Sequence, residues 1–259
     1  MNLNNNTVLI TGGASGIGLE IARAFLSGEN NKVIITGRSE EKLQKAKAEL
    51  DGLVTIQSDV SDPKQIKKLY DQVAKEFPTL NILINNAGVM SYLNLQNHGL
   101  SSDDLTKEVE INLKGTIWMN DIFLPLLKGN DNAATVAVSS GLAFAPLPIS
   151  PIYCATKAAL HSYSISLRAQ LKNTSVKVFE LAPPATDTTL LDVFDPEDMK
   201  GSTPMPLDKM VGVFMKGFAS DKLEICPGQA SQLRFMGRFL PNVILKVLSK
   251  PVDRMHRNG

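Results

Sequence analysis

The stretch from Thr7 to Leu26 contains the pattern that most restricts the fold of this chain. It begins with a short apolar, β-branched run, TVLIT, continues with the glycine-rich segment GGASGIG, and ends with the amphipathic helix pattern LEIARAFL. A strand, a glycine turn and a helix in this order form the first half of a βαβ unit. We therefore expect a sheet whose strands are connected through helices.

The glycine turn has the spacing G-x-x-x-G-x-G, with Gly12, Gly16 and Gly18 in the glycine positions. This differs from the G-x-G-x-x-G of the commonest dinucleotide fingerprint. Glycines let the backbone approach a pyrophosphate closely, and the helix N-terminus that follows supplies N–H donors and the positive end of a dipole. A glycine-rich turn that binds no ligand is the alternative.

The alternation of apolar runs and helical patterns continues along the chain. Strands are predicted at residues 7–11, 32–36, 53–57, 80–84, 134–138, 176–181 and 222–226. The main helices are predicted at residues 19–26, 40–50, 63–77, 105–127, 153–172 and 207–219. With 259 residues, of which 43% are hydrophobic, the chain can bury a sizeable core. The prediction is an α/β fold: a single Rossmann domain over residues 1–259, with a doubly wound parallel sheet of about seven strands and helices on both faces.

Composition excludes several classes of function. The 27 basic and 26 acidic residues give a formal net charge of +1, which provides no bulk field for nucleic acid or an anionic membrane. The two cysteines and three histidines have no metal-like spacing, so neither a disulfide framework nor a metal site is expected. The N-terminus has no basic segment, and its apolar run is too short for a signal peptide or a membrane helix. We expect a cytoplasmic protein that acts on small molecules.

The residues after the second predicted strand bear on nucleotide choice. In a βαβ unit this position reaches the adenosine ribose, where an acidic residue would bind the 2′-hydroxyl of NAD. Here Gly37 and Arg38 occupy it, so a 2′-phosphate would find room and a cation. A solvated surface arginine is the alternative.

Polar residues follow two further strands. Asp59 lies at the carboxyl end of the third strand, where it either accepts from an adenine amino group or stabilises the turn. The fourth strand ends in Asn85-Asn86-Ala87-Gly88, whose small residues suit a backbone that passes close to a ribose, although such a segment also forms simple turns. Asn112 lies within an otherwise apolar helix pattern, where it either stabilises local backbone or holds a water in a proton path.

The segment from Ser139 to Leu160 contains the candidate catalytic residues. Tyr153 and Lys157 are four residues apart in a helix pattern, so their side chains leave the same face one turn apart. A cation beside the phenol would move its pKa down from about 10 towards the working range. Ser139 or Ser140, at the end of the fifth strand, could hydrogen-bond a carbonyl or alcohol oxygen. Taken alone, the Tyr-x-x-x-Lys spacing also fits a solvated surface lysine.

Together these motifs resemble the short-chain dehydrogenase/reductase family from Thr7 to about Gly228. The segments TGGASGIG, NNAG and YCATK, together with Asn112 and Ser140, stand in the family's order. The phrase SSGLAFAPLPISPIYCATKAALHSYSISLR also resembles the bacterial DltE-type branch.

The resemblance implies specific roles. Ser140 would polarise the carbonyl, Tyr153 would donate or accept the proton, Lys157 would lower the pKa of Tyr153 and bind the nicotinamide ribose, and Asn112 would position a water. The cofactor contacts implied are Gly12, Ser15, Gly16, Ile17 and Gly18 at the pyrophosphate, Asp59, Val60, Asn86, Ala87 and Gly88 on the adenosine side, and Pro183, Thr186 and Thr188 at the carboxamide. Arg38 joins them through its position after the second strand. The chain departs from the family at Pro183-Pro184, where Pro-Gly is common, and proline fixes φ and removes a donor.

The function predicted is hydride transfer between NADP(H) and a carbonyl compound or secondary alcohol, with NAD(H) also accepted. A non-catalytic dinucleotide sensor is the alternative, but such a protein would not need the tyrosine acid. Residues 189–206 are predicted to be a substrate loop. The apolar and basic extension at 229–259 either packs on its own domain, covers a partner subunit or, least favoured, lies on a membrane surface. The resemblance also implies a homodimer or homotetramer.

Overall fold

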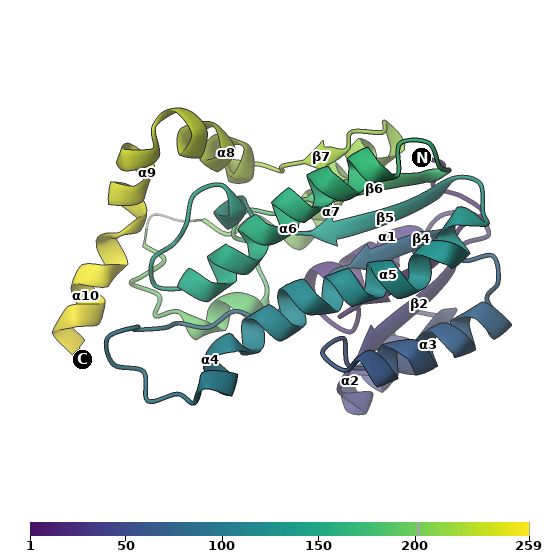
Figure 1. Ribbon diagram of the computed structural model, residues 1–259, viewed down its shortest axis with the longest axis horizontal. Coiled ribbons are helices and arrows are strands. Elements are labelled where there is room, and N and C mark those ends of the chain that lie inside the picture. Colours follow the sequence, from purple (N-terminus) through teal and green to yellow (C-terminus); the bar gives the residue numbers. More distant parts are fainter. Residues whose placement is uncertain (201–202, 259) are drawn as a thin grey trace.

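The sheet contains all of the strands predicted from the sequence. A computed structural model describes residues 1–200 and 203–258 (Figure 1). Within these residues seven parallel strands pair in the order β3-β2-β1-β4-β5-β6-β7. The strands are β1 (Thr7–Thr11), β2 (Lys32–Gly37), β3 (Leu53–Gln57), β4 (Ile82–Asn85), β5 (Ala133–Val138), β6 (Val176–Leu181) and β7 (Glu224–Ile225). The predicted Rossmann-like fold is confirmed; β7 is shorter than expected and β4 begins two residues later.

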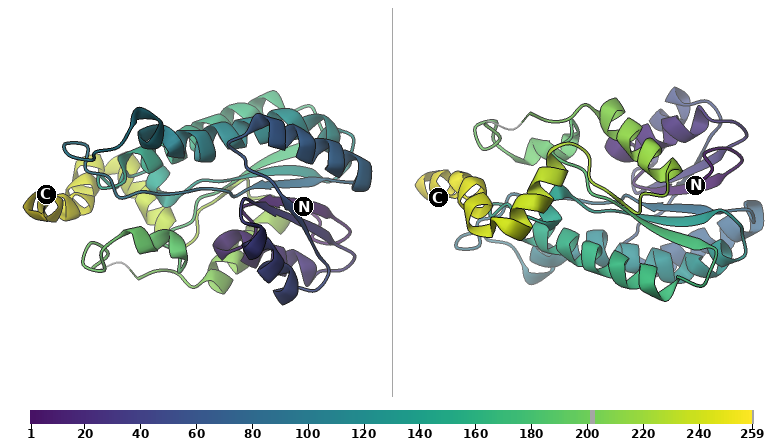
Figure 2. Two further views of the ribbon diagram at one scale, coloured as in Figure 1. Left: turned by 90° about the horizontal axis from the view of Figure 1, so that it is seen from below. Right: turned by 90° about the horizontal axis from the view of Figure 1, so that it is seen from above.

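Helices cover both faces of this sheet, as Figure 2 shows with the sheet seen edge-on. On one face lie α1 (Gly16–Leu26), α2 (Glu40–Glu49) and α7 (Leu207–Ala219). On the other lie α3 (Pro63–Glu76), α5 (Gly115–Lys128) and α6 (Pro151–Gln170). The strands β1, β4 and β5 are buried along their whole length, because apolar layers cover them on both sides. This explains why they appear in the sequence as continuous apolar runs.

Local signals in the sequence explain where several helices begin. The Asp62 carboxylate accepts a hydrogen bond from the Lys64 backbone N–H at 2.8 Å, and Pro63 occupies the first turn of α3. Ser39 caps α2 in the same way through the Lys42 N–H. Pro151 lies in the first turn of α6, the helix that carries Tyr153 and Lys157. These caps fix where each helix leaves the carboxyl edge of the sheet.

The long helix predicted at residues 105–127 is not a uniform α-helix. It consists of α4 (Ser102–Glu108), a π-helix η1 (Val109–Lys114) and α5. The Thr116 hydroxyl donates to the Asn112 carbonyl oxygen at 3.1 Å in this segment. The spacing of apolar residues along a helix does not change detectably when one turn is widened. The π-helix could therefore not be predicted from the sequence.

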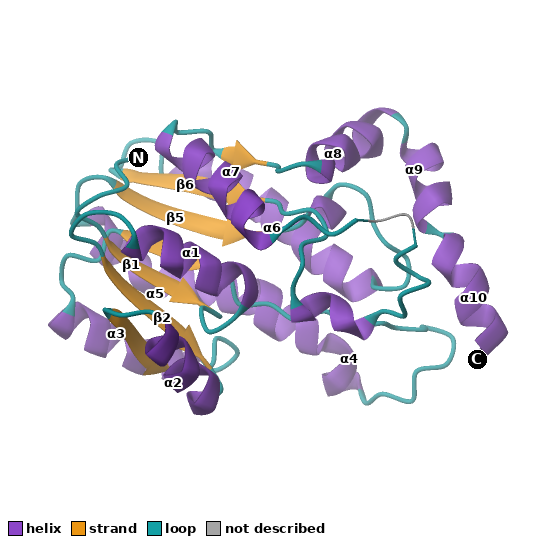
Figure 3. Ribbon diagram, turned by 180° about the vertical axis from the view of Figure 1, so that it is seen from behind, coloured by secondary structure: helices purple, strands orange, loops and turns teal. Residues whose placement is uncertain are grey.

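Three further helices form a C-terminal arm, residues 229–258, which stands beyond the carboxyl edge of the sheet (Figures 1 and 3). They are α8 (Gln229–Phe239), α9 (Pro241–Leu248) and α10 (Lys250–Asn258). The arm packs partly on its own domain, since Ala230, Ile244 and Met255 are buried. Short 3₁₀ helices, η2 (Gly141–Ala143) and η3 (Thr189–Val193), lie in the loops that follow β5 and β6. Residues 201, 202 and 259, which belong to the predicted substrate loop and extension, lie outside the described residues.

Within the described part of the chain, no helix has the length and apolar character needed to cross a membrane.

Candidate active site

The glycine turn lies where the strand order reverses, between β1 and β4. Ligands of open α/β sheets bind at this point of the carboxyl edge. Gly12 has a φ of +63°, and a Cβ atom there would lie 2.8 Å from the Ala87 Cα. Only glycine allows β1 and β4 to end so close together with this backbone conformation. The turn then enters α1 at Gly16, so the N-terminus of that helix faces the same edge.

The Asn86 side chain holds the turn in place. Its amide donates to the carbonyl oxygens of Thr11 and Gly12, each at 3.0 Å. The Thr11 hydroxyl in turn accepts from the backbone N–H groups of Asn86 and Ala87, each at 3.1 Å. Gly18 is buried, and a Cβ atom there would lie 2.5 Å from the Asn86 amide nitrogen. The Asn86 side chain therefore fixes the position of the glycine turn, and Gly18 leaves the space that this side chain occupies.

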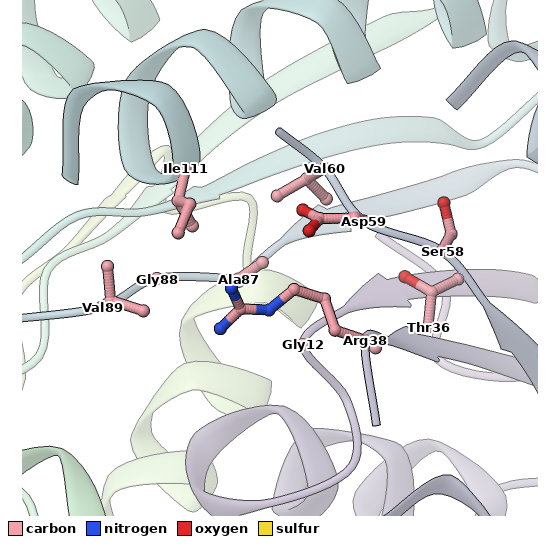
Figure 4. Close-up of a pocket in the computed structure, with 11 residues that line it drawn as sticks. Gly12, Thr36, Arg38, Ser58, Asp59, Val60, Ala87, Gly88, Val89 and Ile111 are labelled. Carbon is pink, nitrogen blue, oxygen red and sulfur yellow. The ribbon is translucent and has the colours of Figure 1, made fainter. Parts of the chain in front are cut away.

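A hollow beside this turn contains Arg38 and two buried hydroxyl groups (Figure 4). The Arg38 side chain extends across the hollow towards Ala87, as Figure 4 shows. The Thr36 and Ser58 hydroxyls line the hollow and have no hydrogen-bond partner among the described residues. Buried polar groups are normally paired, so these two hydroxyls suit a polar ligand. The cavity thus combines a cation with unpaired hydroxyls at the expected adenosine position.

Asp59 and Val60 also line this hollow. The Asp59 carboxylate accepts from the Ser61 N–H at 2.9 Å and from the Ser61 hydroxyl at 2.7 Å. The turn-stabilising contact considered for Asp59 is therefore present, while its place in the hollow keeps it within reach of a ligand. Val60 is buried and packs on Gly115, where a Cβ atom would lie 2.9 Å from the Val60 carbonyl oxygen.

The two serines at the end of β5 have different surroundings. The Ser139 hydroxyl donates to the buried Glu180 carboxylate at 2.5 Å, and the other Glu180 oxygen lies 2.7 Å from His161 Nδ1. Ser140 instead accepts from the Leu142 N–H at 3.1 Å and lies close enough to Tyr153 to oppose the rise in its pKa. Of the two serines, Ser140 is thus the one placed to act together with Tyr153.

Tyr153 and Lys157 leave the same face of α6, as their spacing predicts. The Lys157 ammonium lies 5.5 Å from the centroid of the Tyr153 ring, and both side chains are buried. In the protein alone, burial raises the pKa of the Tyr153 phenol, with the Ser140 hydroxyl opposing the rise. This differs from the lowered pKa predicted from the sequence, because desolvation of the buried phenolate is the largest effect on the phenol.

The Lys157 ammonium is held by the sheet. It donates to the Val138 carbonyl oxygen at 2.8 Å, and a Cβ atom on Gly88 would lie 3.4 Å from its nitrogen. Burial lowers the pKa of Lys157 to about 8, while the charge of Glu108 opposes this. The ammonium therefore lies between the ends of β4 and β5, beside the glycine turn.

Asn112 bridges the π-helix and the chain beyond β4. Its amide oxygen accepts from the Val89 N–H at 2.8 Å, and its amide nitrogen donates to the Val89 carbonyl at 2.9 Å and the Thr156 hydroxyl at 3.2 Å. The side chain is therefore occupied by local structure, the first of the two alternatives for this residue. Like Gly18, it does not line either cavity.

The segment after β6 completes the edge of the site. The Pro183 carbonyl accepts from the Gly141 N–H at 2.8 Å, and the Thr186 hydroxyl donates to the Pro184 carbonyl at 2.9 Å. Thr188 lies against the glycine turn, with its methyl group 3.3 Å from a Cβ atom built on Gly16. Neither Pro183 nor Pro184 has a positive φ, so this segment does not need the left-handed conformation that a glycine would allow.

One large cavity brings most of these residues together. It has a volume of about 1120 Å³ and joins the glycine turn to the catalytic candidates. The predicted residues that line it are Gly12, Ser15, Gly16, Ile17, Arg38, Asn86, Ala87, Gly88, Ser140, Tyr153, Lys157, Pro183, Thr186 and Thr188. Among the described residues, no group of three or more histidine, cysteine, aspartate or glutamate side chains could hold a metal ion.

Two features of the site were not predicted from the sequence. Glu108, one turn before Asn112, is buried, and one of its oxygens has no partner among the described residues. Burial raises the pKa of this carboxyl, while Ser91 and the charge of Lys157 oppose the rise. The sequence around it, SDDLTKEVE, is rich in charged residues and contains no signal that this one would be buried. The second feature is the C-terminal arm, whose helices also line the large cavity.

Comparisons with known proteins place this geometry in context. A family model described as short chain dehydrogenase matches residues 6–198. The chain is 43% identical over 239 residues to an uncharacterized oxidoreductase DltE of Bacillus subtilis, covering 90% of this chain and 92% of that protein. It is 30% identical over 211 residues to an uncharacterized oxidoreductase of Staphylococcus aureus, covering 81% of this chain and 90% of the other.

Solved structures share the fold at lower identity. A short chain dehydrogenase from Burkholderia cenocepacia, in complex with NADP, superposes with a TM-score of 0.82 at 22% identity, over 96% of this chain and 99% of that one. A short chain dehydrogenase/reductase from Burkholderia phymatum, in complex with NAD, gives a TM-score of 0.79 at 22% identity, over 90% and 93%.

Proposed function

The chain belongs to the short-chain dehydrogenase/reductase family, a family of oxidoreductases, and on this basis we propose that it is an NADP(H)-preferring carbonyl reductase or alcohol dehydrogenase. The observation that supports this most directly is that Ser140, Tyr153 and Lys157 line the same cavity as the glycine turn. A protein that only sensed the dinucleotide would need the turn but not a buried acid next to it.

The residues at the carboxyl edge fit a dinucleotide. The backbone of residues 12–18 and the N-terminus of α1 would hold a pyrophosphate, and Arg38 with the hollow around it would hold a 2′-phosphate. Lys157 would bind the nicotinamide ribose, and Thr186 and Thr188 the carboxamide. When bound, NADP(H) exchanges a hydride with the carbonyl carbon of the substrate.

The chain's own residues handle the oxygen and its proton. Ser140 would donate a hydrogen bond to the carbonyl oxygen, which withdraws electrons from the carbon. Because burial raises the pKa of Tyr153, its phenol is protonated at neutral pH and holds the proton that the oxygen would receive, although the same shift makes it a weaker acid. The Lys157 ammonium, held by Val138, would stabilise the phenolate that forms.

The setting of the protein is part of the proposal. Both cysteines are free thiols, as is usual in a reducing compartment, and we assign the protein to the cytoplasm. Residues 189–206 would act as the substrate loop, and the protein would form a homodimer or homotetramer.

The test is a screen of ketones and secondary alcohols by nicotinamide absorbance, with both cofactors. Tyr153→Phe should lower turnover by roughly 10²- to 10⁴-fold, the usual contribution of a positioned acid. Its cofactor affinity, measured by fluorescence, should stay close to that of the wild type. Tyr163→Phe, the same change in the same helix, is the control and should keep its activity. A Tyr153→Phe variant that retains most of its rate would contradict the proton role.

A further inference from the structure

The large cavity continues beyond Tyr153 towards the C-terminal arm. Its volume of about 1120 Å³ exceeds the roughly 300–1000 Å³ of a site for one drug-sized ligand. The part between the loop after β6 and the arm, here called the outer chamber, lies past the residues proposed to hold the dinucleotide. It therefore offers room for the body of a substrate.

One face of the arm lines the outer chamber. Leu233 and Met236 of α8 and Ile244, Val247 and Leu248 of α9 are lining residues. Within α9 these positions follow the spacing i, i+3, i+4, which places them on one side of the helix. The arm thus directs the apolar face of α9 into the cavity, while α8 contributes Gln229 and Gln232 as well as its two apolar residues.

The opposite wall of the outer chamber is also apolar. Leu190, Leu191, Phe194 and Met199 come from the loop after β6 and line the cavity. They pack in one hydrophobic cluster with Tyr153, and Phe194 is buried. An apolar surface therefore extends from the Tyr153 side chain, through the loop after β6, to the arm.

The charged groups at this chamber pair with one another. Arg254 of α10 lies 3.2 Å from Asp195, 3.5 Å from the buried Asp198 and 4.0 Å from Glu197. This cluster joins the arm to the loop. Its three carboxylates face Arg254, and Glu197 also lies 3.5 Å from Lys200, so the cluster keeps an excess of one negative charge and offers no free cation to an anionic substrate. Lys250, another charged lining residue of the arm, is exposed to solvent. An anionic substrate group would be repelled by this excess, and any charged group placed between the apolar side chains themselves would lose its hydration, which is costly.

We propose that the outer chamber binds the apolar body of an uncharged long-chain or fused-ring ketone or secondary alcohol, whose oxygen then reaches Ser140 and Tyr153. This inference rests on the proposed oxidoreductase function for the position of the oxygen. The apolar, uncharged character of the substrate body is inferred from the shape and polarity of the chamber. Substrate affinity should then follow the apolar area of the substrate.

Binding and turnover are measured separately to test this. Calorimetric titrations of 2-butanone, 2-hexanone and 2-octanone are run on the full chain with and without NADP⁺, and reduction is followed with NADPH. The Kd should fall about threefold for each added methylene, so on the order of a hundredfold from 2-butanone to 2-octanone. Equal affinities along the series would overturn the apolar chamber.

A matched pair of variants in α9 locates the binding. Val247 lines the chamber and Leu245 does not, yet both are exposed, at 47% and 43%. Val247→Asp should weaken 2-octanone binding at least tenfold and 2-butanone binding less than twofold, whereas Leu245→Asp should change neither. Equal losses in both variants would overturn the assignment. If binding depends on chain length but no ketone is turned over, the chamber is supported and the proposed function is contradicted. If ketones are turned over but affinity does not depend on chain length, the proposed function is supported and the chamber is contradicted.

Discussion

At the scale of single residues, burial shifts the pKa values of Tyr153 and Lys157 in opposite directions. It raises the pKa of the phenol and lowers that of the ammonium to about 8, so at neutral pH the phenol is protonated and the lysine still carries its charge. A neutral phenol suits proton donation to a ketone, while the depressed lysine sets an upper limit on the useful pH.

The pH dependence of the reaction should reveal this limit. A lysine with its pKa lowered to about 8 loses its ammonium as the pH rises through that value. Its support for the phenolate and the ribose is then lost, so kcat/KM, which reports the free enzyme, should fall about tenfold per pH unit above about 8. Steady-state rates between pH 6 and 10 test this. A flat profile across that range would show that the ammonium is not required.

Glu108 should control the position of that alkaline limb. Its charge raises the pKa of Lys157 against the effect of burial, so Glu108→Gln should move the limb to lower pH. Glu110→Gln is the matched control, because Glu110 is more exposed and pairs with Lys114 on the same π-helix. If both variants kept the wild-type profile, Glu108 would have no electrostatic role at Lys157.

The proposed preference for NADP(H) rests on Arg38, with Gly37 in place of an acid. Charge-assisted hydrogen bonds from Arg38 to a 2′-phosphate contribute about 1.5–3 kcal/mol each, so NADPH should be preferred roughly ten- to a hundredfold. Residual activity with NADH is expected because nothing at this position repels it. The double variant Gly37→Asp/Arg38→Leu should reverse the order of kcat/KM. Equal kcat/KM for both cofactors in the wild type would refute the role of Arg38.

At the scale of elements, the π-helix connects α6, the helix that carries Tyr153 and Lys157, to the chain beyond β4. Asn112 satisfies both backbone groups of Val89, so Asn112→Ala leaves them without partners. Because these groups are only partly buried, a cost of at most about 1–3 kcal/mol for each should appear in urea unfolding, together with weaker cofactor binding. Asn97→Ala, at an exposed loop position, should unfold like the wild type. Unchanged stability of Asn112→Ala would show that these hydrogen bonds are dispensable.

The sequence predicted the sheet well because its strands are buried on both faces. Continuous apolar runs such as residues 7–11 and 134–138 can hardly form anything but central strands once glycine turns and helix patterns flank them. The spacing of Tyr153 and Lys157 likewise determined that they share a face. Features that depend on distant parts of the chain were not predictable. They include the π-helix around Asn112, the burial of Glu108 and the position of the arm at the cavity.

At the scale of the whole molecule, the outer surface of α6 suggests how chains associate. This helix covers the sheet with one face, and its other face exposes small residues and one isoleucine. The exposed positions include Ala155, Ala158, Ser162 and Ile165. Small side chains allow a second helix to approach closely, and the family resemblance predicts that the helices at 105–127 and 153–172 pair with their copies across a two-fold axis.

Light scattering at micromolar concentration should therefore give the wild type a mass of two or four chains. Ser162→Arg should reduce it to one chain, because a two-fold axis would place two like charges near one another in the interface, which costs several kcal/mol. Ala48→Arg, which adds the same charge at an exposed position of α2, should leave the assembly intact. A wild-type mass of one chain would refute the predicted assembly. A Ser162→Arg variant of unchanged mass would instead place the interface elsewhere, with the exposed Phe235 and Phe239 of the arm as the next surface to test.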